Sequence, residues 1–276
     1  MAEIKLIALD LDGTLLDSQK RLSYKNEMAL NKCVEQGIWV VPCTGRIWSG
    51  VPDAVRNLRG VRYAITTNGA GIEDVVEHKM LDERKMSCAL ALEILDLAQQ
   101  FHTMYDVYVG GRAFGERRFM EHMTEYGIPP LIQDMVQRTR QVIPDARAKV
   151  RELGEPVEKI NYFFGDMKER ARAQTALKAR GDVIVTSSFS NNLEINALGA
   201  TKGEGILRLA GYLGLKPEET MGFGDSGNDL TMMDMAGIGV AMGNADEDIK
   251  EHADYVTATN DEDGVAQALE KLIWSR

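Results

Sequence analysis

The feature that most constrains this chain is a pair of aspartates directly after an apolar run. The run spans residues 4–9, and its length and composition predict a buried strand. Asp10 and Asp12 follow where that strand should end, and side chains two residues apart project to the same side of an extended chain. Gly13 then permits a sharp turn, because glycine tolerates a positive φ. Aspartate is mostly exposed unless it is paired or binds a ligand, so the segment indicates a functional site rather than a polar turn.

Three further polar signals stand at predicted strand ends or helix starts. Thr44-Gly45-Arg46 follows a strand-like run, Lys202 begins a predicted helix, and the acidic segment 225–229 lies between an apolar segment and a helical pattern. Together with the first aspartates, these signals resemble the haloacid dehalogenase superfamily, and most closely its Cof-like phosphatases. The resemblance covers nearly the whole chain. It implies a large cap inserted between two halves of a core.

The order of predicted elements gives the fold class: an α/β fold with a Rossmann-like parallel sheet core and an inserted α+β cap domain. Residues 1–82 and 197–276 alternate strands and helices, which predicts a parallel sheet covered by helices. Residues 83–196 lack that alternation, and we expect them to form the cap. Open sheets of this kind bind ligands at the carboxyl ends of their strands, where the polar signals lie.

Within the first half of the core, the pattern predicts a helix over 23–36, a strand over 38–43, a helix over 48–58 and a strand over 63–67. We expect this third strand to extend the same parallel sheet. In the cap, the pattern predicts helices over 87–100 and 168–179, strands over 105–109 and 160–164, and a hairpin joining 183–187 to 193–196.

Composition narrows the partners. The net charge of −10 over 276 residues disfavours nucleic acid and anionic membranes, because both attract basic surfaces. Three cysteines without CxxC spacing fit a reducing cytosol better than a disulfide framework. The chain shows neither a signal peptide nor an apolar run of about 18 residues, so we expect a cytoplasmic protein. The oligomeric state has no signature in the sequence.

The resemblance implies a role for each polar signal. Asp10 would be the nucleophile that forms an aspartyl-phosphate, and Asp12 the general acid and base. To protonate a leaving oxygen near neutral pH, the pKa of Asp12 would have to rise by about 3 units, at a cost of about 4 kcal/mol. The residues expected to contact the phosphate are Leu11, Thr44, Gly45, Arg46, Lys202 and Asn228. For Arg46, an outward salt bridge is an equal alternative.

A metal ion follows from the charges. The carboxylates of Asp10, Asp225 and Asp229 cannot share a small cavity with a phosphate unless a cation joins them. Mg²⁺ prefers octahedral oxygen ligands and accepts substrate phosphate. The resemblance implies that Asp10 and Asp225 bind Mg²⁺ through their carboxylates and Asp12 through its backbone carbonyl. Ser226 or Asp229 would complete the ligands, directly or through water.

The sequence therefore predicts a Mg²⁺-dependent phosphatase for small phosphorylated metabolites, with sugar phosphates first among them. Three alternatives stay open: a phosphomutase of the same superfamily, a receiver-like phospho-acceptor module, and a catalytically silent metabolite-binding protein. Asp12 and the inserted domain argue against the receiver, which needs neither an acid for a leaving group nor a lid. The cap should select the substrate, but its sequence contains no motif from which the substrate can be identified.

Overall fold

The computed structural model describes residues 3–275, which form two compact units. The core unit contains the described residues up to Glu83 together with those from Thr201 onward, and the inserted unit is Arg84–Ala200. The predicted cap, 83–196, begins one residue before this inserted unit and ends four residues before its end. In the described part of the chain, no helix combines the length and apolar character that crossing a membrane requires.

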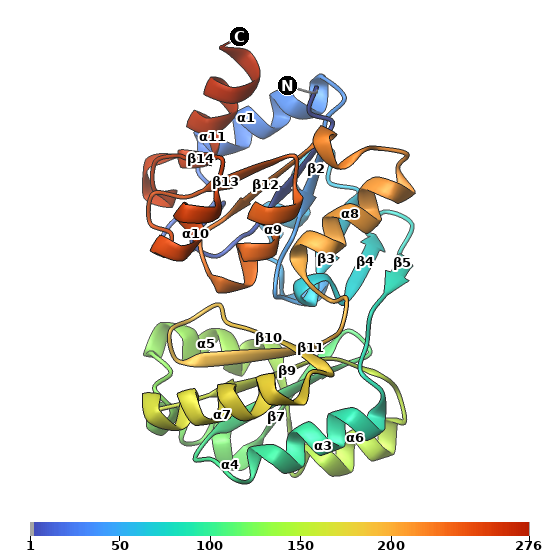
Figure 1. Cartoon of the computed structure of the whole chain (residues 1–276), viewed down its shortest axis with the longest axis vertical. Coiled ribbons are helices and arrows are strands. Elements are labelled where there is room, and N and C mark those ends of the chain that lie inside the picture. Colours follow the sequence, from blue (N-terminus) through green and yellow to red (C-terminus); the bar gives the residue numbers. More distant parts are fainter. Residues whose placement is uncertain (1–2, 276) are drawn as a thin grey trace. The chain divides into compact units, whose positions relative to one another are not determined.

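The core unit is built on a five-stranded sheet in which all neighbouring strands run parallel (Figure 1). In sheet order the strands are β14 (Tyr255–Val256), β13 (Ile238–Ala241), β12 (Thr220–Gly224), β1 (Leu6–Leu9) and β2 (Trp39–Pro42). The chain therefore has the predicted Rossmann-like parallel core. Because β1 and β12 are neighbours, the N-terminal and C-terminal halves of the chain meet at the centre of the sheet.

Helices cover both faces of this sheet. They are α1 (Tyr24–Glu35), α8 (Lys202–Tyr212), α9 (Leu230–Met235), α10 (Glu247–His252) and α11 (Gly264–Leu269), the last continued by a π-helical turn at Glu270–Trp274. Strand β1 shows how the sequence alternates between the two faces. Ile7 and Leu9 join the apolar cluster that contains α1 and α11, whereas Leu6 and Ala8 join the cluster that contains α8, α9 and α10.

Caps fix the ends of the predicted helix over 23–36, which the structure contains as α1. The Ser23 side chain accepts a hydrogen bond from the backbone N–H of Asn26, as an N-cap does. The helix predicted over 48–58 is wrong. A 3₁₀ turn at Trp48–Gly50 and a single turn, α2 (Asp53–Arg56), take its place. Pro52 separates them, because it lacks an N–H and keeps the preceding residue out of helical conformation.

The third predicted strand exists as β3 (Tyr63–Thr66), but it does not extend the parallel sheet. It forms an antiparallel sheet with β4 (Gly71–Asp74) and β5 (Lys79–Glu83). Among the described residues, its one β-bridge to the parallel sheet is an isolated parallel bridge between Ile65 and Cys43, the residue directly after β2. The reason is the turn after β3, where three consecutive residues, 67–69, adopt positive φ and return the chain as a hairpin instead of a helical crossover.

The inserted unit has a six-stranded sheet. In sheet order its strands are β10 (Val183–Thr186), β11 (Asn192–Ala197), β9 (Val157–Phe163), β6 (Met104–Val109), β7 (Arg112–Glu116) and β8 (Arg140–Ile143). Its helices are α3 (Cys88–Ala98), α4 (Arg117–Met120), α5 (Pro130–Thr139), α6 (Ala146–Leu153) and α7 (Met167–Arg180). The predicted hairpin between β10 and β11 is confirmed, whereas β7, β8 and α4 to α6 were not predicted.

Candidate active site

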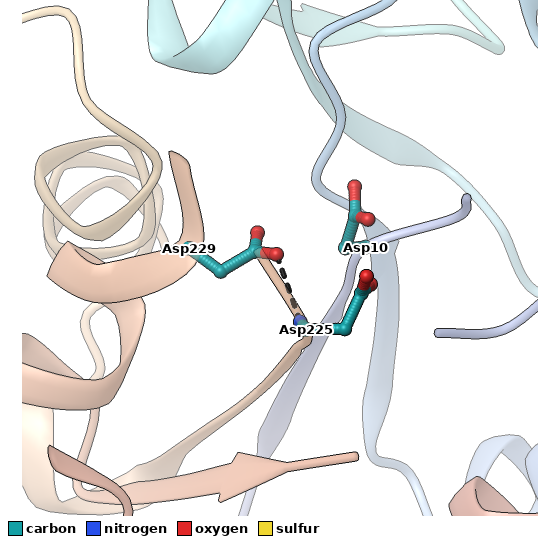
Figure 2. A group of neighbouring side chains, drawn as sticks. All are labelled: Asp10, Asp225 and Asp229. Atoms are coloured by element: carbon teal, nitrogen blue, oxygen red, sulfur yellow. Dashed lines mark hydrogen bonds between the residues drawn. The ribbon is translucent and has the colours of Figure 1, made fainter. Parts of the chain in front are cut away.

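The carboxyl ends of β1 and β12 bring three acids together. Asp10 follows β1, Asp225 follows β12, and Asp229 lies at the start of α9. One carboxylate oxygen of each lies within 4.8 Å of the others, and Figure 2 shows the three side chains converging. Gly13 makes this approach possible. Its φ is +89°, and a Cβ at this position would collide with the Asp225 carboxylate.

Lys202 is the cation inside this cluster. It is the first residue of α8, and its fully buried Nζ lies 2.6 Å from Oδ1 of Asp10 and 2.5 Å from Oδ1 of Asp229. Burial lowers the pKa of Lys202, but the two carboxylates raise it by more. The ammonium therefore stays charged and fixes the orientation of the Asp10 carboxylate.

One ammonium does not balance three carboxylates. Burial raises the pKa of Asp10 and of Asp225 well above the ordinary value, and the charge of Asp229 raises both further, while Lys202 opposes the rise. Thr14 partly offsets the excess, since its hydroxyl donates to Oδ1 of Asp225 at 2.6 Å. Thr14 belongs to the first acidic segment, but no sequence pattern indicated this role for it. The remaining negative charge makes the cluster a candidate binding site for a cation.

The turn after β12 is closed by its own side chains. Oδ2 of Asp229 accepts hydrogen bonds from the backbone N–H groups of Asp225 and Ser226, each at 3.0 Å. The Ser226 hydroxyl donates to Oδ1 of Asn228 at 3.1 Å, and the Asn228 amide donates to Oδ1 of Asn68 at 3.2 Å. Both oxygens of Asp229 are thus engaged by the protein, one by Lys202 and one by the turn.

Asp12 stands apart from the three clustered acids and binds two cations. Arg46 contacts both of its carboxylate oxygens, with Nε to Oδ2 and Nη2 to Oδ1 at 2.7 Å each. Nζ of Lys20 lies 2.9 Å from Oδ1. Burial raises the pKa of Asp12, but these two partners lower it to about 2. The expected rise of this pKa is therefore wrong for this structure, and the Arg46 salt bridge points inward to Asp12 rather than outward.

The other predicted phosphate contacts lie beside these groups. Thr44 is buried, its backbone N–H donates to the carbonyl of Ile65 at 2.9 Å, and its hydroxyl oxygen accepts from the N–H of Arg46 at 3.2 Å. Gly45 lies between them in the same turn. The Leu11 side chain is part of the apolar core, so only its main chain could meet a phosphate. Lys20 was not predicted at all.

Comparison with known proteins agrees with this geometry. A family model described as haloacid dehalogenase-like hydrolase matches residues 7–269. Phosphatase YwpJ of Bacillus subtilis is 34% identical, over 98% of this chain and 100% of its own. The 5-amino-6-(5-phospho-D-ribitylamino)uracil phosphatase YcsE of the same organism is 32% identical, over 97% of this chain and 95% of its own. A solved haloacid dehalogenase-like hydrolase from B. subtilis superposes with a TM-score of 0.85 at 32% identity, covering 98% of this chain and 100% of that chain.

Two findings define the class of protein. The core is a parallel α/β sheet with an Asp–Lys–Asp cluster at its carboxyl edge, and the family model matches nearly the whole chain. The chain belongs to the haloacid dehalogenase-like hydrolases. Within them the predicted resemblance to Cof-like phosphatases is confirmed, and the protein is a phosphoric monoester hydrolase. The receiver-like alternative is set aside.

Proposed function

We propose that this protein hydrolyses small phosphorylated metabolites, sugar phosphates first among them, in a Mg²⁺-dependent reaction through an aspartyl-phosphate on Asp10. One observation carries the proposal. Asp10 is a buried carboxylate at the end of the central strand, held by Lys202 at 2.6 Å and placed among acids that require a further cation. A buried carboxylate in that setting can attack an anionic ester only where cations offset the repulsion.

The donor set fits Mg²⁺. The candidate ligand atoms of the cluster are all carboxylate oxygens, and Mg²⁺, a hard dication, prefers oxygen ligands that include one or two carboxylates. Asp10 and Asp225 would hold the ion, with the backbone carbonyl of Asp12. Asp229 would act by holding Lys202 and the turn rather than as a ligand, because both of its oxygens already have partners. Ser226 would contribute through water. When bound, Mg²⁺ would neutralise charge on the phosphoryl oxygens.

The chemistry that the protein's own groups would perform has two steps. In the first, an oxygen of Asp10 attacks phosphorus, the ester P–O bond breaks, and the leaving oxygen takes a proton from Asp12. In the second, Asp12 removes a proton from water while that water attacks phosphorus. The P–O bond to Asp10 breaks, and inorganic phosphate leaves. Lys202 keeps Asp10 oriented throughout, and Thr44, Gly45 and Asn228 would donate hydrogen bonds to the phosphate.

Asp12 must be protonated before it can donate a proton in the first step. With a pKa of about 2, it would carry a proton in only about one molecule in 10⁵ at pH 7. A general acid increases the reaction rate by about 10²- to 10⁴-fold. So small a fraction of protonated Asp12 would cancel that gain. We infer that the dianionic ester draws Arg46 or Lys20 away from Asp12 when it binds. The structure then corresponds to the resting enzyme, in which Asp12 is a carboxylate.

The substrate class follows from the charge and from the relatives. A net charge of −10 does not favour nucleic acid, and one relative is named for a phosphorylated ribityl compound. All three cysteines are free thiols, two of them buried, which supports a cytoplasmic location. We propose that the inserted unit selects the leaving group.

The test is a substrate panel with purified protein and Mg²⁺. Steady release of inorganic phosphate from phenyl phosphate and faster release from sugar phosphates are expected. Phosphopeptides on folded domains should react slowly. Conversion of one sugar phosphate to its isomer without phosphate release would instead indicate a phosphomutase. Absence of phosphate release from the whole panel would refute the proposal.

A further inference from the structure

Lys20 lies in the loop after Asp12, and its backbone conformation is unusual. Its φ is +62°, in the left-handed region that residues other than glycine and asparagine seldom adopt. The turn around it holds this conformation. Oδ1 of Asp17 accepts hydrogen bonds from the backbone N–H groups of Gln19 at 2.9 Å and Arg21 at 2.8 Å. The N–H of Lys20 itself donates to the carbonyl of Asp17 at 2.8 Å. Conformations of this kind persist where their surroundings fix them, and they cluster at functional sites.

The C-terminal part of the core unit anchors the same loop. The Asp261 carboxylate accepts a hydrogen bond from the backbone N–H of Ser18 at 2.7 Å, although the two residues are 243 positions apart. The Asn260 amide donates to the carbonyl of Leu16 at 2.9 Å. The backbone of the loop therefore has a fixed place within the core unit, and the side chain of Lys20 is the part that can move.

Asp12 is oriented without Lys20. Arg46 contacts both oxygens of the Asp12 carboxylate, and its Nη1 donates to the carbonyl of Gly50 at 2.8 Å, so the guanidinium is itself held in place. Lys20 adds one contact, from Nζ to Oδ1 of Asp12 at 2.9 Å. A second cation on a carboxylate that is already held does little to orient it. The anchored loop that brings Lys20 there indicates that this lysine serves a different anion.

Of the two cations on Asp12, Lys20 is the easier to displace. Its side chain is 32% exposed, against 18% for Arg46. Among residues 3–275, Asp12 is the one acidic side chain within ion-pair distance of the Lys20 ammonium. An ammonium carries three hydrogens on a flexible four-carbon stem, whereas a bidentate guanidinium must break two bonds at once. An arriving anion would therefore draw Lys20 away first.

The phosphate of a bound ester would lie within reach of Lys20. To give its proton to the leaving oxygen, Asp12 must lie about 3 Å from that oxygen. Nζ of Lys20 lies 2.9 Å from Oδ1 of Asp12, so a leaving oxygen bound to Oδ1 would be within about 6 Å of the ammonium before any movement. Lys202 is not available in the same way, because its Nζ already contacts two carboxylates.

We propose that Lys20 binds a phosphoryl oxygen of the substrate, exchanging the Asp12 carboxylate for the phosphate when the ester binds. This inference rests on the proposed function, which places the ester at Asp10 and Asp12. No covalent bond forms or breaks in the exchange, and Lys20 stays an ammonium throughout. Because every residue concerned belongs to the core unit, Lys20 would recognise the phosphate that all substrates share rather than the leaving group.

The affinity for inorganic phosphate in the presence of Mg²⁺, measured by titration calorimetry, tests this contact. Lys20→Met should raise the Kd about tenfold, because a charge-assisted hydrogen bond is lost. Lys20→Arg keeps the charge and should recover most of the affinity. Lys25→Met is the matched control, since the Lys25 side chain is 76% exposed on α1 and pairs with Asp263. We expect no change in the control. An equal loss of affinity in the two methionine variants would reduce the effect to net charge and overturn the proposal.

The Asp12→Asn variant separates a contact with phosphate from an effect that passes through Asp12. If Lys20 served only to hold Asp12, Lys20→Met would not alter phosphate binding once the Asp12 carboxylate is gone. We expect the same tenfold increase in Kd in the Asp12→Asn background as in the wild type. An unchanged Kd in that background would contradict the proposal.

Kinetics give a second readout, with phenyl phosphate and glucose 6-phosphate as two esters that share only the phosphate. Lys20→Met should raise KM about tenfold for both, with a smaller change in kcat. A loss confined to one ester would place Lys20 beside the leaving group and overturn the inference. If the wild type binds phosphate and hydrolyses phenyl phosphate but Lys20→Met matches it, this inference alone has failed. If the wild type does neither, the proposed function itself has failed.

Discussion

Arg46 holds both oxygens of the Asp12 carboxylate, with two N–O distances of 2.7 Å. The two residues are 34 positions apart in the sequence and come from turns after neighbouring parallel strands, β1 and β2. This pair, together with Lys20, keeps the expected acid–base residue ionised. It distinguishes Asp12 from Asp10, whose pKa is raised by burial.

Replacing Arg46 with methionine should lower kcat/KM by about 10- to 100-fold, because the dianionic ester would lose a cation that it attracts when it binds. The pKa of Asp12 should rise, since a cation that lowers it is gone. Any limb of the pH–rate profile that reports Asp12 should therefore move to higher pH. A profile with unchanged limbs would show that Asp12 is not the titrating group.

The same pair predicts how stability depends on pH. Asp12 has a lower pKa in the fold, about 2, than the reference 3.8 of the unfolded chain. Its ion pairs therefore stabilise the fold above about pH 4, and that contribution, about 2 kcal/mol, disappears as the pH falls toward 2. Denaturant unfolding of wild type and Asp12→Asn should show a gap in free energy that narrows below pH 4. Parallel curves would contradict this.

Lys202→Met should destabilise the fold by about 3–5 kcal/mol without Mg²⁺, because it leaves buried carboxylates without their cation. Added Mg²⁺ should recover part of the loss. Lys20→Met is the matched control: its side chain is 32% exposed, so removing its ion pair with Asp12 should cost less than about 1 kcal/mol. Equal losses in the two variants would mean that Lys202 does not balance the cluster. The measurement is the free energy of unfolding with and without Mg²⁺.

Chelation should abolish phosphate release, and Mg²⁺ should restore it. Thr14→Val should raise the Mg²⁺ concentration needed for half-maximal activity by about 10- to 100-fold, since it removes the hydroxyl that orients Asp225. Thr14→Ser should behave nearly as wild type. Full activity in thoroughly chelated protein would refute the metal assignment.

Asp10, Lys202 and Asp225 could be found from the sequence because each stands at a strand end or a helix start. A parallel sheet brings such positions to one edge, so their order along the chain was sufficient. Lys20 could not be found in this way. It reaches Asp12 because the Asp17 carboxylate accepts hydrogen bonds from the following backbone and closes a turn in which Lys20 has a φ of +62°. Hydrophobic periodicity does not predict such a turn.

The strands missed in the inserted unit have a similar explanation. β8 follows α5 with no residue between them, so neither glycine nor proline marks the change from helix to strand. β7 contains two charged residues and a glycine and does not read as a strand. It forms because Gly110 and Gly111, both at positive φ, turn the chain back along β6. That Gly-Gly pair was a hairpin signal that the sequence did contain.

The central claim is that Asp10 becomes phosphorylated. The most direct measurement is acid quenching during turnover of a radiolabelled phosphate ester, followed by peptide mapping of wild type and Asp10→Asn. We expect label on the peptide that contains Asp10, its release by hydroxylamine, and neither label nor turnover in the folded variant. Label on a different residue, or steady hydrolysis by Asp10→Asn, would contradict this account of the active site.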